Sequence, residues 1–67
     1  MNNIGKKIKE LRVLKKLTQK QLSEQSGVAF RTIQNYEAGT RVPTLEIAIS
    51  LADFFDISLD DLAGRKR

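Results

Sequence analysis

The stretch of sequence that decides the fold runs from residue 17 to residue 39 and reads LTQKQLSEQSGVAFRTIQNYEAG. Thr18 stands three residues before Gln21, which is the spacing of a capping box, where each side chain bonds to the other residue's backbone N–H. Gly27 is the natural residue for a left-handed helix end. These signals predict a helix that runs from Gln19 to about Ser26 and is followed by a tight turn.

The second half of the same stretch predicts another short helix. Phe30, Ile33 and Tyr36 recur at three-residue steps, and Gly39 closes the pattern. Two helices joined by a turn are not diagnostic alone, because any helical bundle contains such a pair. The spacing adds information, since Leu22 and Ile33 fall where two steeply crossing helices share a core.

Outside this stretch, apolar spacing and the residues typical of helix starts and ends predict three further helices. Apolar residues recur at helical spacing between residues 4 and 14, with lysines on the remaining faces. Pro43 marks a loop, Thr44 can cap a helix that runs to about Phe55, and Ser58 begins a final turn that Gly64 closes. The apolar positions of the first helix are Ile4, Ile8, Leu11 and Leu14. We expect an all-α domain of five helices over residues 1–64, with residues 65–67 as a basic tail.

The composition argues against several function classes. The chain of 67 residues has no cysteine and no histidine, so it has neither a disulfide nor an ordinary zinc site. The same absences remove the commonest nucleophile and the commonest general base, which makes an enzyme an unfavourable interpretation. No apolar run approaches the roughly 18 residues of a membrane span. We expect a cytoplasmic protein that is not an enzyme and has no cofactor, no metal and no membrane contact.

The positive charge is unevenly distributed. Residues 1–41 hold nine Lys or Arg against three Glu, a net charge of +6, whereas residues 42–67 hold three against five acidic residues, a net charge of −2. Such an asymmetry suits a polyanion, and binding to a phosphate backbone releases counterions. The same charges also fit a solvated helix face that keeps a small protein soluble, so charge alone does not choose between the two.

Residues 17–23, Gly27-Val28 and residues 33–39, with Pro43 behind them, resemble the Cro/C1-type (XRE-like) helix-turn-helix family, which includes lambdoid phage repressors. The pattern continues through Leu45, Ala48, Leu51, Ala52 and residues 57–62. The resemblance implies a compact lambda-repressor-like domain that binds double-stranded DNA, as a repressor and as a homodimer on a pseudo-palindromic operator. The alternative is an antitoxin or adaptor that binds a partner protein and uses DNA binding for autoregulation.

By this resemblance, the first turn of the second helix of the pair points at base edges. The implied base-reading residues are Ala29, Phe30, Arg31, Thr32 and Asn35. Arg31 suits a bidentate contact to guanine, with a phosphate contact as the competing role, and Asn35 suits adenine or a phosphate. Phe30 has two interpretations, because its spacing from Ile33 fits the core whereas the matching family position faces DNA. Ala29 departs from the family, which commonly has a capping Ser or Thr there.

Phosphate contacts are expected on both sides of the second helix of the pair. Thr18 and Gln19 lie at a predicted helix start, where exposed N–H groups and the helix dipole favour an anion. The resemblance pairs Arg12 with Glu37, which also lets the arginine lie near a phosphate. The predicted phosphate contacts are Arg12, Thr18, Gln19, Tyr36, Thr40 and Arg41.

The helix from residue 45 to residue 55 carries more apolar surface than one core needs. Leu45, Ala48, Leu51, Ala52 and Phe55 share one face. Ile47 and Phe54 lie nearly opposite, with Leu51 flanking both. This second stripe either packs against the last helix or the tail, or it is a surface for self-association. The predicted dimer interface is Ile47, Leu51 and Phe54.

Overall fold

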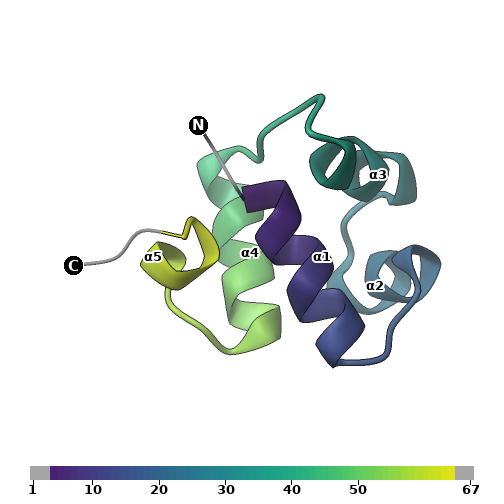
Figure 1. The fold of residues 1–67 in the computed structure, drawn as a ribbon, viewed down its shortest axis with the longest axis horizontal. Helices are drawn as coiled ribbons and strands as arrows, with labels where there is room; N and C mark the ends of the chain where they lie inside the picture. The colour runs from purple at the N-terminus through teal and green to yellow at the C-terminus, as the bar shows by residue number, and fades with distance from the viewer. Residues whose placement is uncertain (1–3, 65–67) are drawn as a thin grey trace.

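The computed structural model describes residues 4–64 as five helices joined by short loops (Figure 1). The helices are α1 (Ile4–Leu14), α2 (Gln19–Ser26), α3 (Phe30–Ala38), α4 (Leu45–Phe55) and α5 (Leu59–Leu62). No strand occurs within these residues, so the predicted all-α, five-helix fold is confirmed. The predicted basic tail, residues 65–67, lies outside the described residues. None of the helices in the described part of the chain has the length and apolar content to cross a membrane.

The helices begin and end where the capping residues and glycines of the sequence predict. The capping box of α2 is complete, because Thr18 Oγ1 accepts from the Gln21 N–H at 3.0 Å and the Thr18 N–H donates to Gln21 Oε1 at 2.9 Å. Thr44 and Ser58 cap α4 and α5 in the same way through their hydroxyl oxygens. Gly27 closes α2 with a φ of 79°. Local hydrogen bonds therefore set most of the element boundaries.

Three helix ends lack their usual residue. Ala29 precedes α3 without a side-chain cap, as the sequence indicated, so the first N–H groups of α3 have no side-chain acceptor there. Lys16, behind α1, and Asp56, behind α4, adopt positive φ angles of 59° and 57°. The Asp56 N–H still bonds back to the last turn of α4. The chain thus turns sharply at two positions where no glycine signals the turn.

Each helix contributes one completely buried side chain to a single core. The five residues with an exposed fraction of 0% are Ile8, Leu22, Ile33, Leu51 and Leu62. Smaller contributions come from around them, among them Val28, Tyr36 and Phe55. Because every helix has an anchor in the same cluster, none of them is an appendage.

Four apolar residues have an exposure that the sequence predicted wrongly or left open. Leu14 and Leu45, expected on core faces, are 77% and 67% exposed, because each stands at a helix end, beyond the turns that meet the core. Phe30 is 43% exposed, so the core interpretation is the wrong one of the two that its spacing and its family position left open. The prediction that Leu51 lies at a dimer interface is wrong, since this side chain is completely buried within one molecule. Its spacing from Ala48 and Phe55 places it on the core face of α4.

Gly5 allows α1 to lie directly against α3. A Cβ atom on Gly5 would stand 1.8 Å from the Tyr36 carbonyl oxygen and 2.8 Å from its carbon. These neighbours are backbone atoms, so they can yield only if the two helices move apart. The sequence gives no local signal for this contact, because the partner lies about thirty residues away.

We predict that Gly5→Ala destabilises the domain by about 1–3 kcal/mol, the usual result of overpacking. The direction of the change in unfolding free energy distinguishes the two cases, since alanine in place of helical glycine normally stabilises by about 0.5–1 kcal/mol. Urea unfolding followed by circular dichroism measures the difference, with exposed Lys6→Ala as the neighbouring control. A Gly5→Ala variant more stable than the wild type would contradict the close approach.

Candidate nucleic-acid interface

The pair of helices α2 and α3 packs around a small apolar centre. Leu22, Val28 and Ile33 are all buried there. The Ser26 hydroxyl donates to the Leu22 carbonyl at 2.6 Å and accepts from the Val28 N–H at 3.3 Å, so it braces the turn from both sides. The predicted shared core of the pair is confirmed, and the turn between the helices is tightly held.

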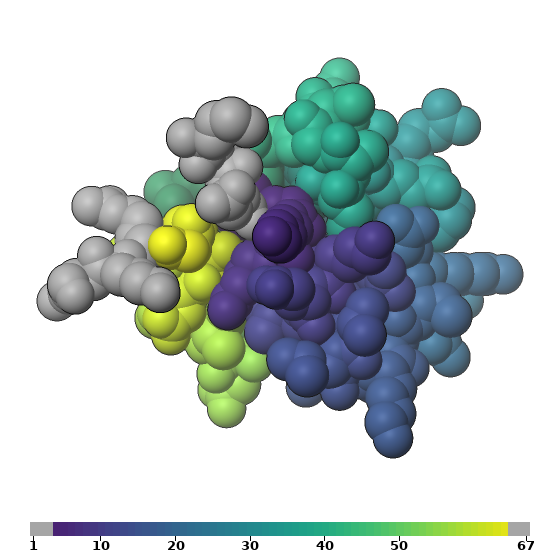
Figure 2. Space-filling model, in the orientation of Figure 1, coloured from purple at the N-terminus to yellow at the C-terminus, as the bar shows by residue number. Residues whose placement is uncertain are grey.

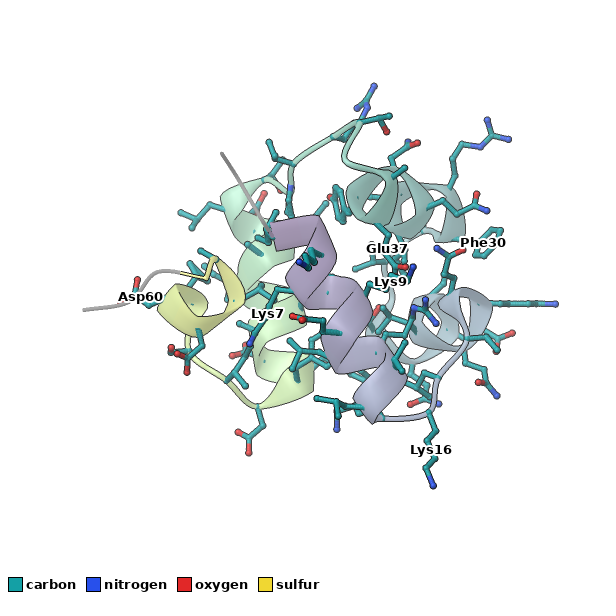
Figure 3. The ribbon with its side chains drawn as sticks, viewed as in Figure 1. Lys7, Lys9, Lys16, Phe30, Glu37 and Asp60 are labelled. Carbon is teal, nitrogen blue, oxygen red and sulfur yellow. The ribbon has the colours of Figure 1, made fainter. Side chains whose placement is uncertain are left out.

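α3 divides cleanly into a buried side and an open side. Ile33 and Tyr36 face the core, whereas Ala29, Phe30 and Arg31 are exposed. Thr32 and Asn35 are half-buried. Figure 3 shows Phe30 projecting outward on the side of the molecule formed by α2 and α3, away from α4 and α5. All five predicted base-reading residues therefore retain surface, and they lie at and beyond the start of α3.

The Glu37 carboxylate joins α3 to both α1 and α2. Arg12 grips it with two bonds, from Nε to Oε2 at 2.8 Å and from Nη2 to Oε1 at 3.1 Å. Gln19 Nε2 donates to the same Oε1 at 3.1 Å. The Arg12 and Glu37 side chains are only 13% and 5% exposed. The predicted pairing of Arg12 with Glu37 is confirmed, and Gln19 joins it as a third member that the sequence did not reveal.

The hydrogen bonds within the clamp, which Arg12, Gln19 and Glu37 form, determine how many N–H groups of these residues remain available to a ligand. Arg12 Nη1 donates to the Leu17 carbonyl at 2.7 Å, so three of the five guanidinium N–H groups are engaged. The hydrogen bond to Glu37 raises the pKa of Arg12, and burial opposes that shift. The guanidinium therefore stays charged, with two N–H groups available for a phosphate. The Gln19 amide likewise retains one N–H.

A second group of predicted phosphate contacts lies at the carboxyl-terminal end of α3. The Thr40 hydroxyl donates to the Asn35 backbone carbonyl at 3.2 Å and lies 3.3 Å from Asn35 Oδ1. Tyr36 is 3% exposed, so its ring belongs to the core. Burial raises the pKa of Tyr36, and the positive charge of Arg41 partly opposes this shift. Arg41 itself is exposed. The structure thus brings Asn35, Thr40, Arg41 and the Tyr36 side chain together at one end of α3.

The three residues predicted to form a dimer interface do not make one surface. Beside the buried Leu51, Ile47 and Phe54 are partly buried against the core. The Phe54 ring packs edge-on against Phe55, with centroids 5.2 Å apart, and Lys15 Nζ covers it at 5.8 Å. The exposed apolar side chains of this region are instead Val42, Leu45 and Ile49, at 61%, 67% and 44%. Leu45 and Ile49 lie four residues apart on one face of α4, a signal in the sequence that we missed, whereas Val42 lies in the loop before the helix.

No group of three or more acidic, cysteine or histidine side chains in the described part of the chain could hold a metal ion. The surface formed by α2 and α3 instead presents hydrogen-bond donors, cations and the exposed ring of Phe30. These are groups that bind phosphates and base edges.

Comparison with known proteins gives a consistent set of relatives. A family model described as helix-turn-helix matches residues 8–62. The phage CTXphi transcriptional repressor RstR of Vibrio cholerae is 38% identical over 48 residues, which are 72% of this chain and 43% of that protein. The transcriptional regulator AnsR of Bacillus subtilis is 38% identical over 61 residues, 91% of this chain and 53% of that protein. The transcriptional activator BcrR of Enterococcus faecalis is 37% identical over 58 residues, 87% of this chain and 28% of that protein.

This chain spans about half the length of the first two relatives. No solved structure gives a significant match.

We predict that Arg12→Ala and Glu37→Ala each destabilise the domain by about 3 kcal/mol, because each leaves a poorly solvated charge unpaired. The double variant should lose much less than the sum of the two, since neither charge then remains without a partner. Urea unfolding of the four proteins measures the coupling, with Arg31→Ala and Glu37→Ala as a control cycle. Additive losses in the Arg12 cycle would remove the clamp from the account.

Proposed function

This chain belongs to the helix-turn-helix family, and from that premise we propose that it is a transcriptional regulator that reads double-stranded DNA with the open side of α3. The observation that carries the proposal is that α3 has one buried side and one side open to solvent. Its buried side is fixed by Ile33, Tyr36 and the Glu37 clamp, while Phe30 and Arg31 are left exposed without a structural role in the monomer. In proteins of this type the second helix of the pair lies in the major groove.

The exposed side chains of α3 suit recognition of base edges. Arg31 is long, exposed and able to donate two parallel bonds to O6 and N7 of guanine. Phe30 and Ala29 offer apolar contact to a thymine methyl group, which specifies a base without a hydrogen bond. Thr32 and Asn35 lie further along α3, and Asn35 Oδ1 is already close to Thr40. We therefore assign the main discrimination between bases to Arg31 and Phe30.

The two flanking groups would hold the phosphate backbone and so fix the register of docking. At the start of α2, Thr18, Gln19 and Arg12 combine free donors with the positive end of the helix dipole. Behind α3, Arg41 contributes a cation, with the hydroxyls of Thr40 and Tyr36 nearby. The net charge of +6 on residues 1–41 supports the same orientation.

We propose that the regulator is a repressor. Support comes from the relative RstR, which is named a repressor, while BcrR is named an activator, so the family serves both outcomes. A protein that covers a promoter blocks polymerase by occupying its site. A regulator of this kind would act in the cytoplasm, where the DNA is.

A second copy would double the length of DNA that is read. We place the dimer contact at the surface formed by Val42, Leu45 and Ile49, rather than at the stripe expected from the sequence. Exposed Arg41 and Glu46 directly adjoin Val42 and Leu45 in the sequence, so a two-fold axis could pair opposite charges around these apolar side chains. This surface also continues the loop that holds Thr40 and Arg41. Two recognition helices about 34–36 Å apart would then match one turn of DNA and a pseudo-palindrome.

We predict different losses for the two exposed arginines. Arg31→Ala should weaken binding to the preferred duplex by about 1–3 kcal/mol and relax the preference at one base position. Arg41→Ala should weaken binding to all sequences alike and lower the slope of log affinity against log salt by about 1. Fluorescence anisotropy titrations over a panel of single-base duplex variants make the comparison. Identical base preferences in wild type and Arg31→Ala would exclude base reading by Arg31.

We also predict that the double variant Leu45→Ser/Ile49→Ser is a monomer. It should lose about 100-fold or more in affinity for a full operator, because the second half-site is no longer held at high effective concentration, and keep its affinity for a half-site. Sedimentation equilibrium and anisotropy measure the two effects. The matched control is Val13→Ser/Leu14→Ser, which removes equally exposed apolar side chains elsewhere. Unchanged mass and operator affinity in the first variant would exclude this interface.

A further inference from the structure

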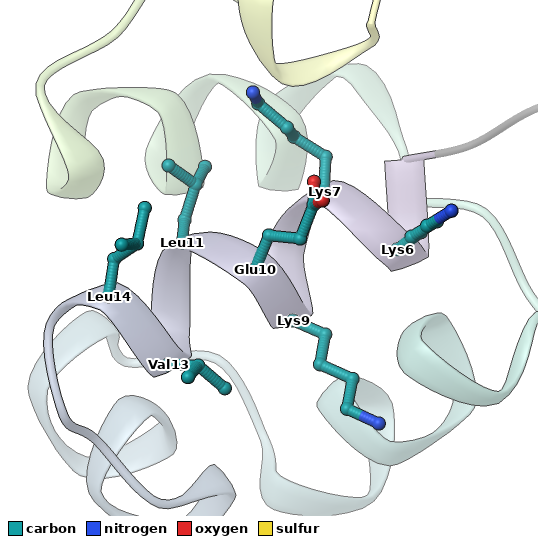
Figure 4. Close-up of a pocket in the computed structure, with 7 residues that line it drawn as sticks. All are labelled: Lys6, Lys7, Lys9, Glu10, Leu11, Val13 and Leu14. Carbon is teal, nitrogen blue, oxygen red and sulfur yellow. The ribbon is translucent and has the colours of Figure 1, made fainter.

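The outer surface of α1 carries apolar side chains that neither the core nor the DNA-reading face uses. Leu14 is 77% exposed, the largest value among the exposed large hydrophobic residues, and Val13 beside it is 56% exposed. They border a shallow groove of about 650 Å³ (Figure 4). The residues that line the groove are Lys6, Lys7, Lys9, Glu10, Leu11, Val13 and Leu14. We propose that this α1 groove binds an acidic amphipathic helix of another protein.

Each side of α1 along the groove pairs apolar side chains with a lysine. Figure 4 shows Leu11 and Leu14 on the same side of α1 as Lys7, while Val13 and Lys9 point to the opposite side. α1 lies on an open face of the molecule, between α2 and α5 (Figure 2). Leu11 and Leu14, three residues apart on one side of α1, suit the anchors of a second helix packed along it.

The charge around the groove selects the chemistry of the partner. Residues 4–17 contain five lysines and one arginine against a single acidic residue, Glu10. Of these cations, Arg12 is held by Glu37 and Lys15 lies over the Phe54 ring, while Lys6, Lys7 and Lys9 line the groove. A partner helix with apolar anchors on one face and carboxylates at its flanks would satisfy both features of the surface. A phosphate backbone would satisfy only the lysines, since it gains nothing from an exposed leucine.

A second copy of the chain fits this groove poorly. A two-fold axis through the groove would bring lysines against lysines, and such like-charge contacts oppose association. The surface of Val42, Leu45 and Ile49 differs in this respect, because one cation and one carboxylate adjoin it, whereas three lysines outnumber Glu10 in the groove. The two exposed apolar surfaces are therefore assigned to different partners. The α1 proposal does not depend on DNA binding, and its test contains no DNA.

The test uses a synthetic helical peptide with leucines along one face and glutamates on the other, labelled with a fluorophore. A peptide of the same composition in scrambled order is the control ligand. We expect the amphipathic peptide to bind, and to shift the backbone amide signals of residues 10–16 in NMR spectra. Val13→Ser/Leu14→Ser should weaken binding by about tenfold or more, as expected when two apolar contacts leave an interface. Leu45→Ser/Ile49→Ser should leave the peptide affinity unchanged.

Several results would overturn the proposal. One is the absence of binding, and another is equal binding of the scrambled peptide, which would indicate attraction by charge alone. Equal weakening by the two double variants, or amide shifts centred on α3, would place the contact elsewhere. Binding to anionic phospholipid vesicles that needs Leu14, without peptide binding, would assign the groove to a membrane surface. A concentration-dependent rise in mass that Val13→Ser/Leu14→Ser abolishes would assign it to a second copy.

Discussion

The Glu37 carboxylate is the contact on which the orientation of the recognition helix depends. It sits almost out of solvent, where an unpaired charge would be strongly unfavourable, and Arg12 and Gln19 supply three donors to it. Those donors come from α1 and from the first residue of α2. α3 is thereby tied to two other helices at its carboxyl-terminal end, while Gly5 removes the Cβ that would otherwise hold α1 away. The open side of α3 is a consequence of these two constraints.

A domain of this size can bury only part of its apolar surface, and the division it makes is informative. One side chain from each helix is fully enclosed, and the apolar residues left outside fall mainly at helix ends and in a loop. Apart from Phe30 on α3, these exposed residues fall into two groups whose neighbouring charges differ. The group that includes Val42, Leu45 and Ile49 adjoins Arg41 and Glu46, and we assign it to a two-fold contact, whereas lysines line the groove on α1. The core therefore sets the fold, and the apolar side chains that it leaves exposed are the ones to which we assign partners.

Local signals in the sequence predicted most of the fold, because caps and glycines act within a few residues. Thr18 with Gln21, Gly27 and Gly39 are such signals. Periodicity, however, shows which residues share a helix face and not where a neighbouring helix stops, so Leu14 and Leu45 were wrongly placed in the core. The Gly5 contact and the bond from Gln19 to Glu37 join residues far apart in the chain, which no local pattern reveals. The roles of Arg31, Phe30 and the phosphate-contacting residues remain predictions.

The central claim is that the clamp formed by Arg12, Gln19 and Glu37 presents α3 to DNA so that the chain reads sequence. Selection of bound duplexes from a random pool, at a fixed physiological salt concentration, tests this claim most directly. The account predicts enrichment of two inverted half-sites whose centres lie about 10–10.5 base pairs, or one turn, apart. Recovery of duplexes with no shared sequence, bound with an affinity that depends only on salt, would contradict it.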